Sequence, residues 1–94
     1  MSQPPAVTHH AAARRFEIKI ADALAVAEYE LAGHRMILTH TLVPPELRGR
    51  GLAEQLVRTA LAEAASRQLR VVPQCSYVAT FIQRHPEFQH LVDA

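Results

Sequence analysis

A chain of 94 residues and 10.4 kDa has room for one domain with a single hydrophobic core. Its composition, 49% hydrophobic and 20% charged with three glycines and six prolines, excludes a disordered, collagen-like or low-complexity chain. A formal net charge of +1 argues against general nucleic-acid or anionic-membrane binding, and the single cysteine, Cys75, excludes an internal disulfide.

Residues 1–13 show no periodicity and predict a flexible N-terminal tail, followed by one domain over 14–94. No apolar run approaches the roughly 18 residues of a membrane span, and the first residues do not resemble a leader peptide. We therefore expect a soluble protein of the reducing cytoplasm, with no membrane partner. The adjacent His9 and His10 lack further ligands, so no metal site is expected.

The first strand is expected at 15–20, where apolar and charged residues alternate. A second alternating run at 24–31, a turn at 32–33 and a third run at 34–43 predict a β-hairpin. The third strand must end before Pro44 and Pro45, because proline has no N–H to continue a ladder.

The clearest helix is expected at 52–69, because its apolar residues recur on one face. That face is formed by Leu52, Ala53, Leu56, Val57, Ala60, Leu61 and Ala64. A short strand at 70–73 follows, and Ser76 is expected to cap a second helix that ends before Pro86. Residues 86–94 are expected to form a short tail.

The segment 36–73 has the order strand, helix, strand, which predicts a right-handed crossover between parallel neighbours. Ligands bind beyond the carboxyl ends of such strands. At that edge lies the loop 48–51, Arg-Gly-Arg-Gly, where glycines and a helix N-terminus favour an anion site, although a plain structural turn is the alternative. A nucleoside triphosphate or dinucleotide loop is disfavoured, since no Gly-Lys-Ser/Thr follows and Glu54 replaces the third glycine.

Taken as Arg48-x-x-Gly51-x-Ala53, this loop resembles the Q/R-x-x-G-x-G/A pyrophosphate loop of the GNAT superfamily of acyl-CoA-dependent N-acetyltransferases. Together with it, the segments His-Thr-Leu-Val-Pro at 40–44, Val-Pro-Gln-Cys-Ser-Tyr at 72–77 and His-Pro-Glu-Phe at 85–88 look like the signature blocks of the short, single-domain GNAT-like branch. The resemblance covers about residues 16–92.

This resemblance implies an α/β GNAT-like fold, with a mainly antiparallel sheet, one splayed parallel strand pair and two flanking helices. It also implies acetyl-CoA as the small-molecule acyl donor, with its pyrophosphate on the 48–53 backbone and its pantetheine arm along the end of the third strand. The cofactor-binding residues expected are Leu42, Val43, Arg48, Gly49, Arg50, Gly51, Leu52, Ala53, Ser76 and Arg84.

The chain departs from the family pattern in its length. It is shorter than ordinary GNAT domains and lacks the helical arm that walls the acceptor site between the first two strands. We therefore expect an open acceptor side, an amine acceptor that the sequence does not identify, and a monomer or weak homodimer.

Two residues are candidates for catalysis. Cys75 precedes the second helix, whose dipole is expected to lower the pKa of its thiol, so that it either carries the acetyl group or only walls the pocket. His40 is either a general base or a hydrogen-bonded core histidine, because it shares strand parity with Leu38 and Leu42. Tyr77 is expected in the core, with a pantetheine contact as the alternative.

The predicted function is acetyl-CoA-dependent transfer of an acetyl group to an amine. The alternative is a CoA-binding or interaction module with little or no catalysis, because the acceptor arm is missing and no carboxylate is an evident base. An RNA-binding domain is disfavoured by the near-neutral charge and by the lack of an aromatic stacking surface.

Overall fold

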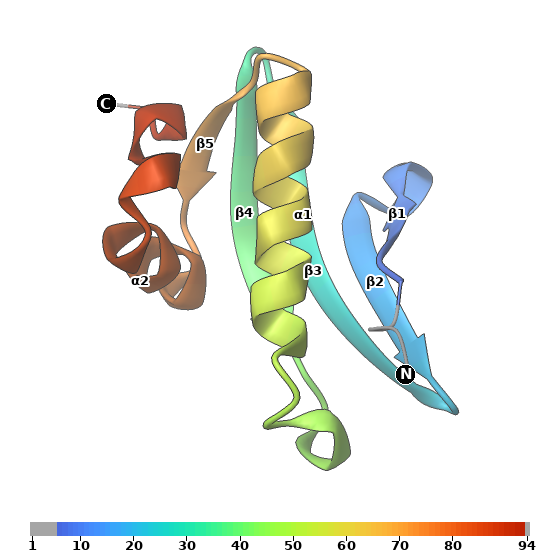
Figure 1. The fold of residues 1–94 in the computed structure, drawn as a ribbon. Coiled ribbons are helices and arrows are strands. Elements are labelled where there is room, and N and C mark those ends of the chain that lie inside the picture. The colour runs from blue at the N-terminus through green and yellow to red at the C-terminus, as the bar shows by residue number, and fades with distance from the viewer. Residues whose placement is uncertain (1–5, 94) are drawn as a thin grey trace.

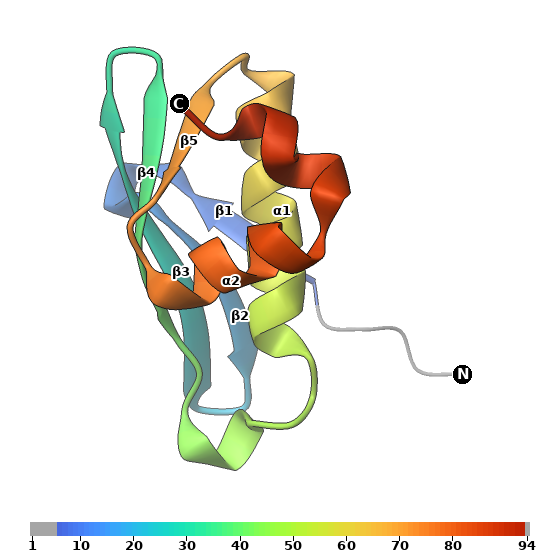
Figure 2. The ribbon, with the colours of Figure 1, turned by 90° about the vertical axis from the view of Figure 1, so that its left-hand side faces the viewer.

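The computed structural model describes residues 6–93, which form one five-stranded sheet in the order β1-β2-β3-β4-β5. Both α-helices lie on the same side of this sheet (Figures 1 and 2). The strands are β1 (Thr8–His10), β2 (Arg15–Ile20), β3 (Ala23–Ala32), β4 (Arg35–Leu42) and β5 (Arg70–Pro73), the helices α1 (Leu52–Ser66) and α2 (Ser76–Arg84), and the 3-10 turns η1 (Ala11–Ala13), η2 (Pro45–Leu47) and η3 (Pro86–Leu91). The predicted α/β fold is confirmed.

The parallel pair predicted from the strand–helix–strand order is present between β4 and β5. Strands β1 to β4 pair antiparallel, whereas β5 runs parallel to β4 over the four positions from Arg35 opposite Arg70 to Leu38 opposite Pro73. Beyond Pro73 no ladder continues, while β4 runs on to Leu42. The two strands therefore separate at their carboxyl ends, as the splayed pair requires.

A β-bulge interrupts the predicted hairpin in the middle of β4. Glu28 pairs with His40 and Tyr29 pairs with Leu38, so Thr39 has no partner of its own on β3. One extra residue reverses the faces to which later side chains point. Leu38 is therefore buried, while Leu42 is 48% exposed.

The apolar face predicted for the long helix packs on the sheet. All its members except the partly buried Ala53 are buried, against a sheet face that includes Phe16, Ile18, Met36 and Val71. None of the described residues belongs to a helix that is long and apolar enough to cross a membrane.

Helix α1 ends at Ser66, three residues before the predicted boundary. Gln68 has φ +58°, the Leu69 N–H donates to Ala64 O at 2.8 Å, and the Gln68 N–H donates to Ala65 O at 3.1 Å. These two bonds form a Schellman motif, in which glycine is the usual residue at the left-handed position.

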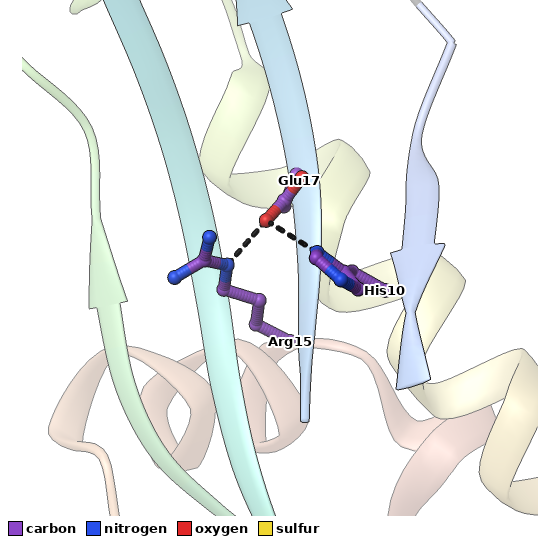
Figure 3. A network of polar contacts seen from close by, with 3 residues as sticks. All are labelled: His10, Arg15 and Glu17. Atoms are coloured by element: carbon purple, nitrogen blue, oxygen red, sulfur yellow. Dashed lines mark hydrogen bonds and ion pairs between the residues drawn. The ribbon is translucent and has the colours of Figure 1, made fainter. Parts of the chain in front are cut away.

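The flexible tail predicted for 1–13 is wrong for residues 8–13, while 1–5 lie outside the described residues. Thr8–His10 form β1 and pair with residues 15–17 of β2. Glu17 Oε2 lies 3.4 Å from His10 Nδ1 and also accepts a hydrogen bond from Arg15 Nε (Figure 3). This bond from Arg15 holds the pKa of Glu17 below its usual value, and His10 contributes in the same direction.

The side chain of His9 attaches β1 to the rest of the sheet. Its ring stacks on Phe16 with 4.2 Å between centroids, and its Nε2 lies 2.7 Å from the Tyr29 hydroxyl. These contacts join residues that are far apart in sequence, so a search for local periodicity does not find the strand.

The predicted C-terminal tail is also ordered. It begins with η3, and Val92 then forms a parallel bridge with Val71 on the outer edge of β5. Arg70 donates to His90 O at 3.0 Å and to Val92 O at 2.6 Å. The last described residues thus cover an edge that would otherwise expose unpaired backbone groups.

Replacing Gln68 with Gly is expected to raise the free energy of unfolding by about 1 kcal/mol, because glycine adopts the left-handed conformation without the steric cost that other L-residues incur. Urea denaturation measures the change. The matched control is Ala62→Gly on the exposed middle of α1, which should lower the free energy by about 1 kcal/mol. A loss of stability in Gln68→Gly would contradict the assigned cap.

Candidate functional site

A hollow of about 440 Å³ lies at the N-terminus of α1 beside the end of β4. It is formed where the loop after β4 turns into α1 and where the first turn of α2 approaches from β5. Its walls are Thr41, Val43, Leu47, Arg48, Gly49, Gly51, Leu52, Ala53, Glu54 and Tyr77.

The loop at the floor of this site presents backbone donors. Gly49 and Gly51 have φ of +84° and +74°, and a Cβ built on either meets nothing within 4 Å, so the space beside this backbone is open to a ligand. Gly51 is the N-cap, and the first helical bond runs from the Gln55 N–H to Gly51 O. The N–H groups of residues 52–54 thus have no acceptor within the helix, and together with the positive end of the helix dipole they make this a place that suits an anion.

Two side chains shape this loop. Arg48 folds back on the end of β4, where its Nε donates to Val43 O at 3.1 Å and closes the turn. The Glu54 carboxylate at the wall is paired with Arg58 Nε at 2.9 Å, one helical turn away, which partly offsets its negative charge beside the loop.

Cys75 lies where β5 has parted from β4. Its backbone N–H donates to Leu38 O at 2.9 Å, and its Sγ donates to Thr41 Oγ1 at 3.6 Å. Cys75 is itself the N-cap of α2, and Ser76 is the first helical residue, so the predicted Ser76 cap is wrong.

The pKa of the Cys75 thiol is lowered, as predicted from its place before a helix. Partial burial raises the pKa, but the backbone N–H of Val78, the Thr41 hydroxyl and the backbone N–H of Tyr77 stabilise the thiolate and together outweigh that effect. The shift therefore comes from individual donors at the start of α2 and on β4.

His40 does not lie in the core. The bulge at Thr39 places it directly opposite Glu28 with an exposed side chain, and no hydrogen bond from its ring is found within residues 6–93. The expectation of a hydrogen-bonded core histidine is wrong, because the extra residue breaks the parity that His40 shares with Leu38 in sequence. His40 is not among the residues that line the hollow.

Six of the ten expected cofactor-binding residues line the hollow, namely Val43, Arg48, Gly49, Gly51, Leu52 and Ala53. The other four do not. Leu42 is turned away by the bulge, Arg50 lines a separate hollow near the β2–β3 turn, Arg84 lines a small hollow along α2, and the side chain of Ser76 is exposed at the start of α2.

Three wall residues, Thr41, Leu47 and Glu54, are not predicted by the sequence, and Tyr77 is predicted only as the alternative to a core position. The side chain of Thr41 reaches the hollow because of the bulge, for which the sequence carries no signal. The side chains of Leu47 and Glu54 reach it because of the way the loop before α1 turns. The expectation of a core Tyr77 is wrong, because its side chain is 40% exposed and walls the hollow. Partial burial, with the Glu54 carboxylate nearby, raises the pKa of Tyr77 and keeps the phenol protonated at neutral pH.

The connections between the first three strands are short, as expected for a chain without the helical arm. Strands β1 and β2 are joined by η1 and Arg14, and β2 and β3 by the tight turn at Ala21 and Asp22. Within the described part of the chain, no α-helix precedes α1.

Comparison with known proteins agrees with this architecture. The family model of the GCN5-related N-acetyl-transferases matches residues 15–91. Protein NATD1 of Bos taurus is 35% identical over 91 residues, covering 94% of this chain and 80% of that protein, and NATD1 of Homo sapiens is 33% identical with the same coverage. A solution structure from Staphylococcus aureus, described as GCN5-like, shares the fold with a TM-score of 0.76 at 21% identity, covering 95% of this chain and 88% of that one. The chain with the glycine–arginine loop and the splayed β4–β5 pair belongs to the GCN5-related N-acetyltransferase family.

Proposed function

We propose that this protein transfers an acetyl group from acetyl-CoA to an amine. The observation that carries the proposal is the hollow at the N-terminus of α1, which joins a set of free backbone N–H groups to Thr41, the hydrogen-bond partner of Cys75. The loop side of this site suits a diphosphate. Cys75 does not line the hollow, but its thiol, whose pKa is lowered, contacts the wall residue Thr41.

The residues of the loop fit the acyl donor. The N–H groups at 49–53 and the α1 dipole match the pyrophosphate, and Val43 and Tyr77 form apolar walls for the pantetheine arm. Acetyl-CoA supplies the activated acetyl thioester when bound. The chain's own contribution is then to orient that thioester and to move protons.

We infer that the Cys75 thiolate accepts the acetyl group first. Its Sγ forms a bond to the acetyl carbon as the bond from that carbon to the CoA sulfur breaks, and one thioester replaces another. The amine nitrogen then forms its bond to the same carbon, the Cys75 thiolate leaves, and the ammonium proton passes to solvent or to a base. Tyr77, held as the protonated phenol on the wall of the hollow, supplies a proton for the departing CoA thiolate.

Binding at the loop is tested by Ala53→Glu. A carboxylate at this first-turn position suits the helix dipole and should leave stability unchanged or higher by about 0.5 kcal/mol, yet it should weaken CoA binding at least about tenfold by repelling the diphosphate. Calorimetry with CoA measures the affinity.

The matched control for this variant is Ala62→Glu, on the exposed face of the same helix, which should bind CoA as the wild type does. In the wild type, CoA should also slow amide exchange at residues 49–53. Wild-type protein that fails to bind CoA, or Ala53→Glu that binds equally well, would remove the proposed site.

The ionisation of Cys75 is tested by its alkylation rate with iodoacetamide against pH. Because the folded pKa is lowered, the thiolate forms at a lower pH than in a free cysteine, and the midpoint of the rate profile should fall below about 8.5. Thr41→Val removes one stabilising donor and should move the midpoint upward. A wild-type midpoint at or above that of a cysteine peptide would contradict the assigned environment.

The acetyl-cysteine step is tested by mass spectrometry. Wild-type protein incubated with acetyl-CoA and no amine should gain one acetyl group on Cys75, and Cys75→Ala should gain none. Transfer assays over small amines and basic peptides then compare the two proteins. Undiminished transfer by Cys75→Ala would leave direct transfer as the mechanism, whereas CoA binding without transfer to any acceptor would favour a binding module.

A further inference from the structure

Glu54 places a carboxylate beside the backbone N–H groups that the proposed function assigns to a diphosphate. It lies in the first turn of α1 and is a wall of the hollow at the N-terminus of that helix. A carboxylate at the third position of a helix commonly folds back over the first turn, where free N–H groups and the helix dipole attract it. In that conformation Glu54 would occupy the place of a ligand anion.

In the structure the Glu54 carboxylate is turned toward the next turn of the helix. Its Oε2 accepts a hydrogen bond from Arg58 Nε at 2.9 Å. The acidic residue precedes the basic one by four positions, which is the favourable orientation for an ion pair on a helix. The side chain of Glu54 is 50% exposed and that of Arg58 is 43% exposed. An isolated pair with this exposure would hold the carboxylate only weakly.

Arg58 has a second set of contacts that fix the position of its guanidinium. Its Cζ lies 5.3 Å from the centroid of the Phe81 ring and 5.7 Å from that of the Phe88 ring. These rings belong to α2 and η3, which lie in front of α1 in Figure 2. Phe81 is buried and Phe88 is partly buried, so the core holds both rings in place. Cation–π contacts with two such rings restrict Arg58 and strengthen its hold on Glu54.

The same helix carries a second pair with the same spacing. Arg67 Nη1 lies 3.8 Å from Glu63 Oε2 near the other end of α1, roughly 22 Å from the loop. Within residues 6–93, both cation–π contacts found are made by Arg58. The Glu63–Arg67 pair is therefore a matched control for a charge pair that has neither the aromatic contacts nor the place beside the loop.

We infer that Arg58 is a positioning residue, which holds the Glu54 carboxylate away from the N–H groups of residues 52–54 and so keeps them open to an anionic ligand. The inference rests on the proposed function, which places a diphosphate at this loop. Arg58 is not among the residues that line the hollow, so it acts through Glu54. Without Arg58, the carboxylate becomes an internal competitor for the ligand.

The test is a double-mutant cycle on CoA affinity, measured by calorimetry. Arg58→Gln should weaken CoA binding about threefold, because the freed carboxylate competes for the loop. Glu54→Ala should bind CoA at least as tightly as the wild type, and adding Arg58→Gln to it should change the affinity by less than about 1.5-fold. Packing against the two rings is lost in both backgrounds and cancels in this comparison. Arg67→Gln should bind CoA as the wild type does.

A second measurement follows the same N–H groups in the ligand-free protein. In Arg58→Gln the amides of residues 52–54 should exchange with solvent at least about twofold more slowly than in the wild type, because the freed carboxylate accepts hydrogen bonds from them. The double variant Glu54→Ala/Arg58→Gln should lose this protection. Arg67→Gln should show the wild-type rates.

The outcomes separate this inference from the proposed function. Unchanged amide exchange in Arg58→Gln would overturn the inference and leave the loop site intact. An equal loss of CoA affinity from Arg58→Gln in both backgrounds would also overturn it, because Arg58 would then attract the ligand without the help of Glu54. Failure of the wild type to bind CoA would overturn the proposed function and this inference together.

Discussion

The bulge at Thr39 is the constraint on which the site depends. A regular β4 would turn His40 and Leu42 toward α1 and would send Thr41 to the opposite face. With one extra residue, Thr41 turns to the helix side, where it walls the hollow and contacts the Cys75 sulfur. The same shift moves Leu42 and His40 out to the other face. A single irregularity in a hairpin ladder thereby determines which side chains of β4 reach the hollow and Cys75.

Two helix N-termini meet at the edge where β4 and β5 separate. Helix α1 follows β4 through the glycine–arginine loop, and α2 follows β5 through Cys75. Since the strands are parallel, their carboxyl ends share an edge, and each helix begins there with free N–H groups. One set faces the hollow at 48–54, and the other helps lower the pKa of Cys75. The proposed anion site and the lowered pKa of the Cys75 thiol therefore come from the same architecture.

The first and last described segments each cover one edge of the small sheet. Strand β1 is held by His9 and His10 at one side, and Val92 bridges to β5 at the other. A domain of this size buries a modest core, so covering both sheet edges adds hydrogen bonds and protects against edge-to-edge pairing. Neither segment contacts the main hollow, whose walls lie between Thr41 and Tyr77, and their contribution is to the stability of the scaffold.

The sequence by itself determined the strands at 15–42, the long helix, the parallel pair and the place of the glycine–arginine loop before that helix. Each depends on local signals, which are alternation, helical periodicity, and glycine or proline at a turn. It also placed Cys75 before a helix. Only the tertiary structure decided that residues 8–10 form a strand, that His40 is exposed, and that Thr41 and Tyr77 wall the site. These outcomes depend on contacts between distant residues and on strand register, and a one-residue shift in register leaves no trace in composition or periodicity.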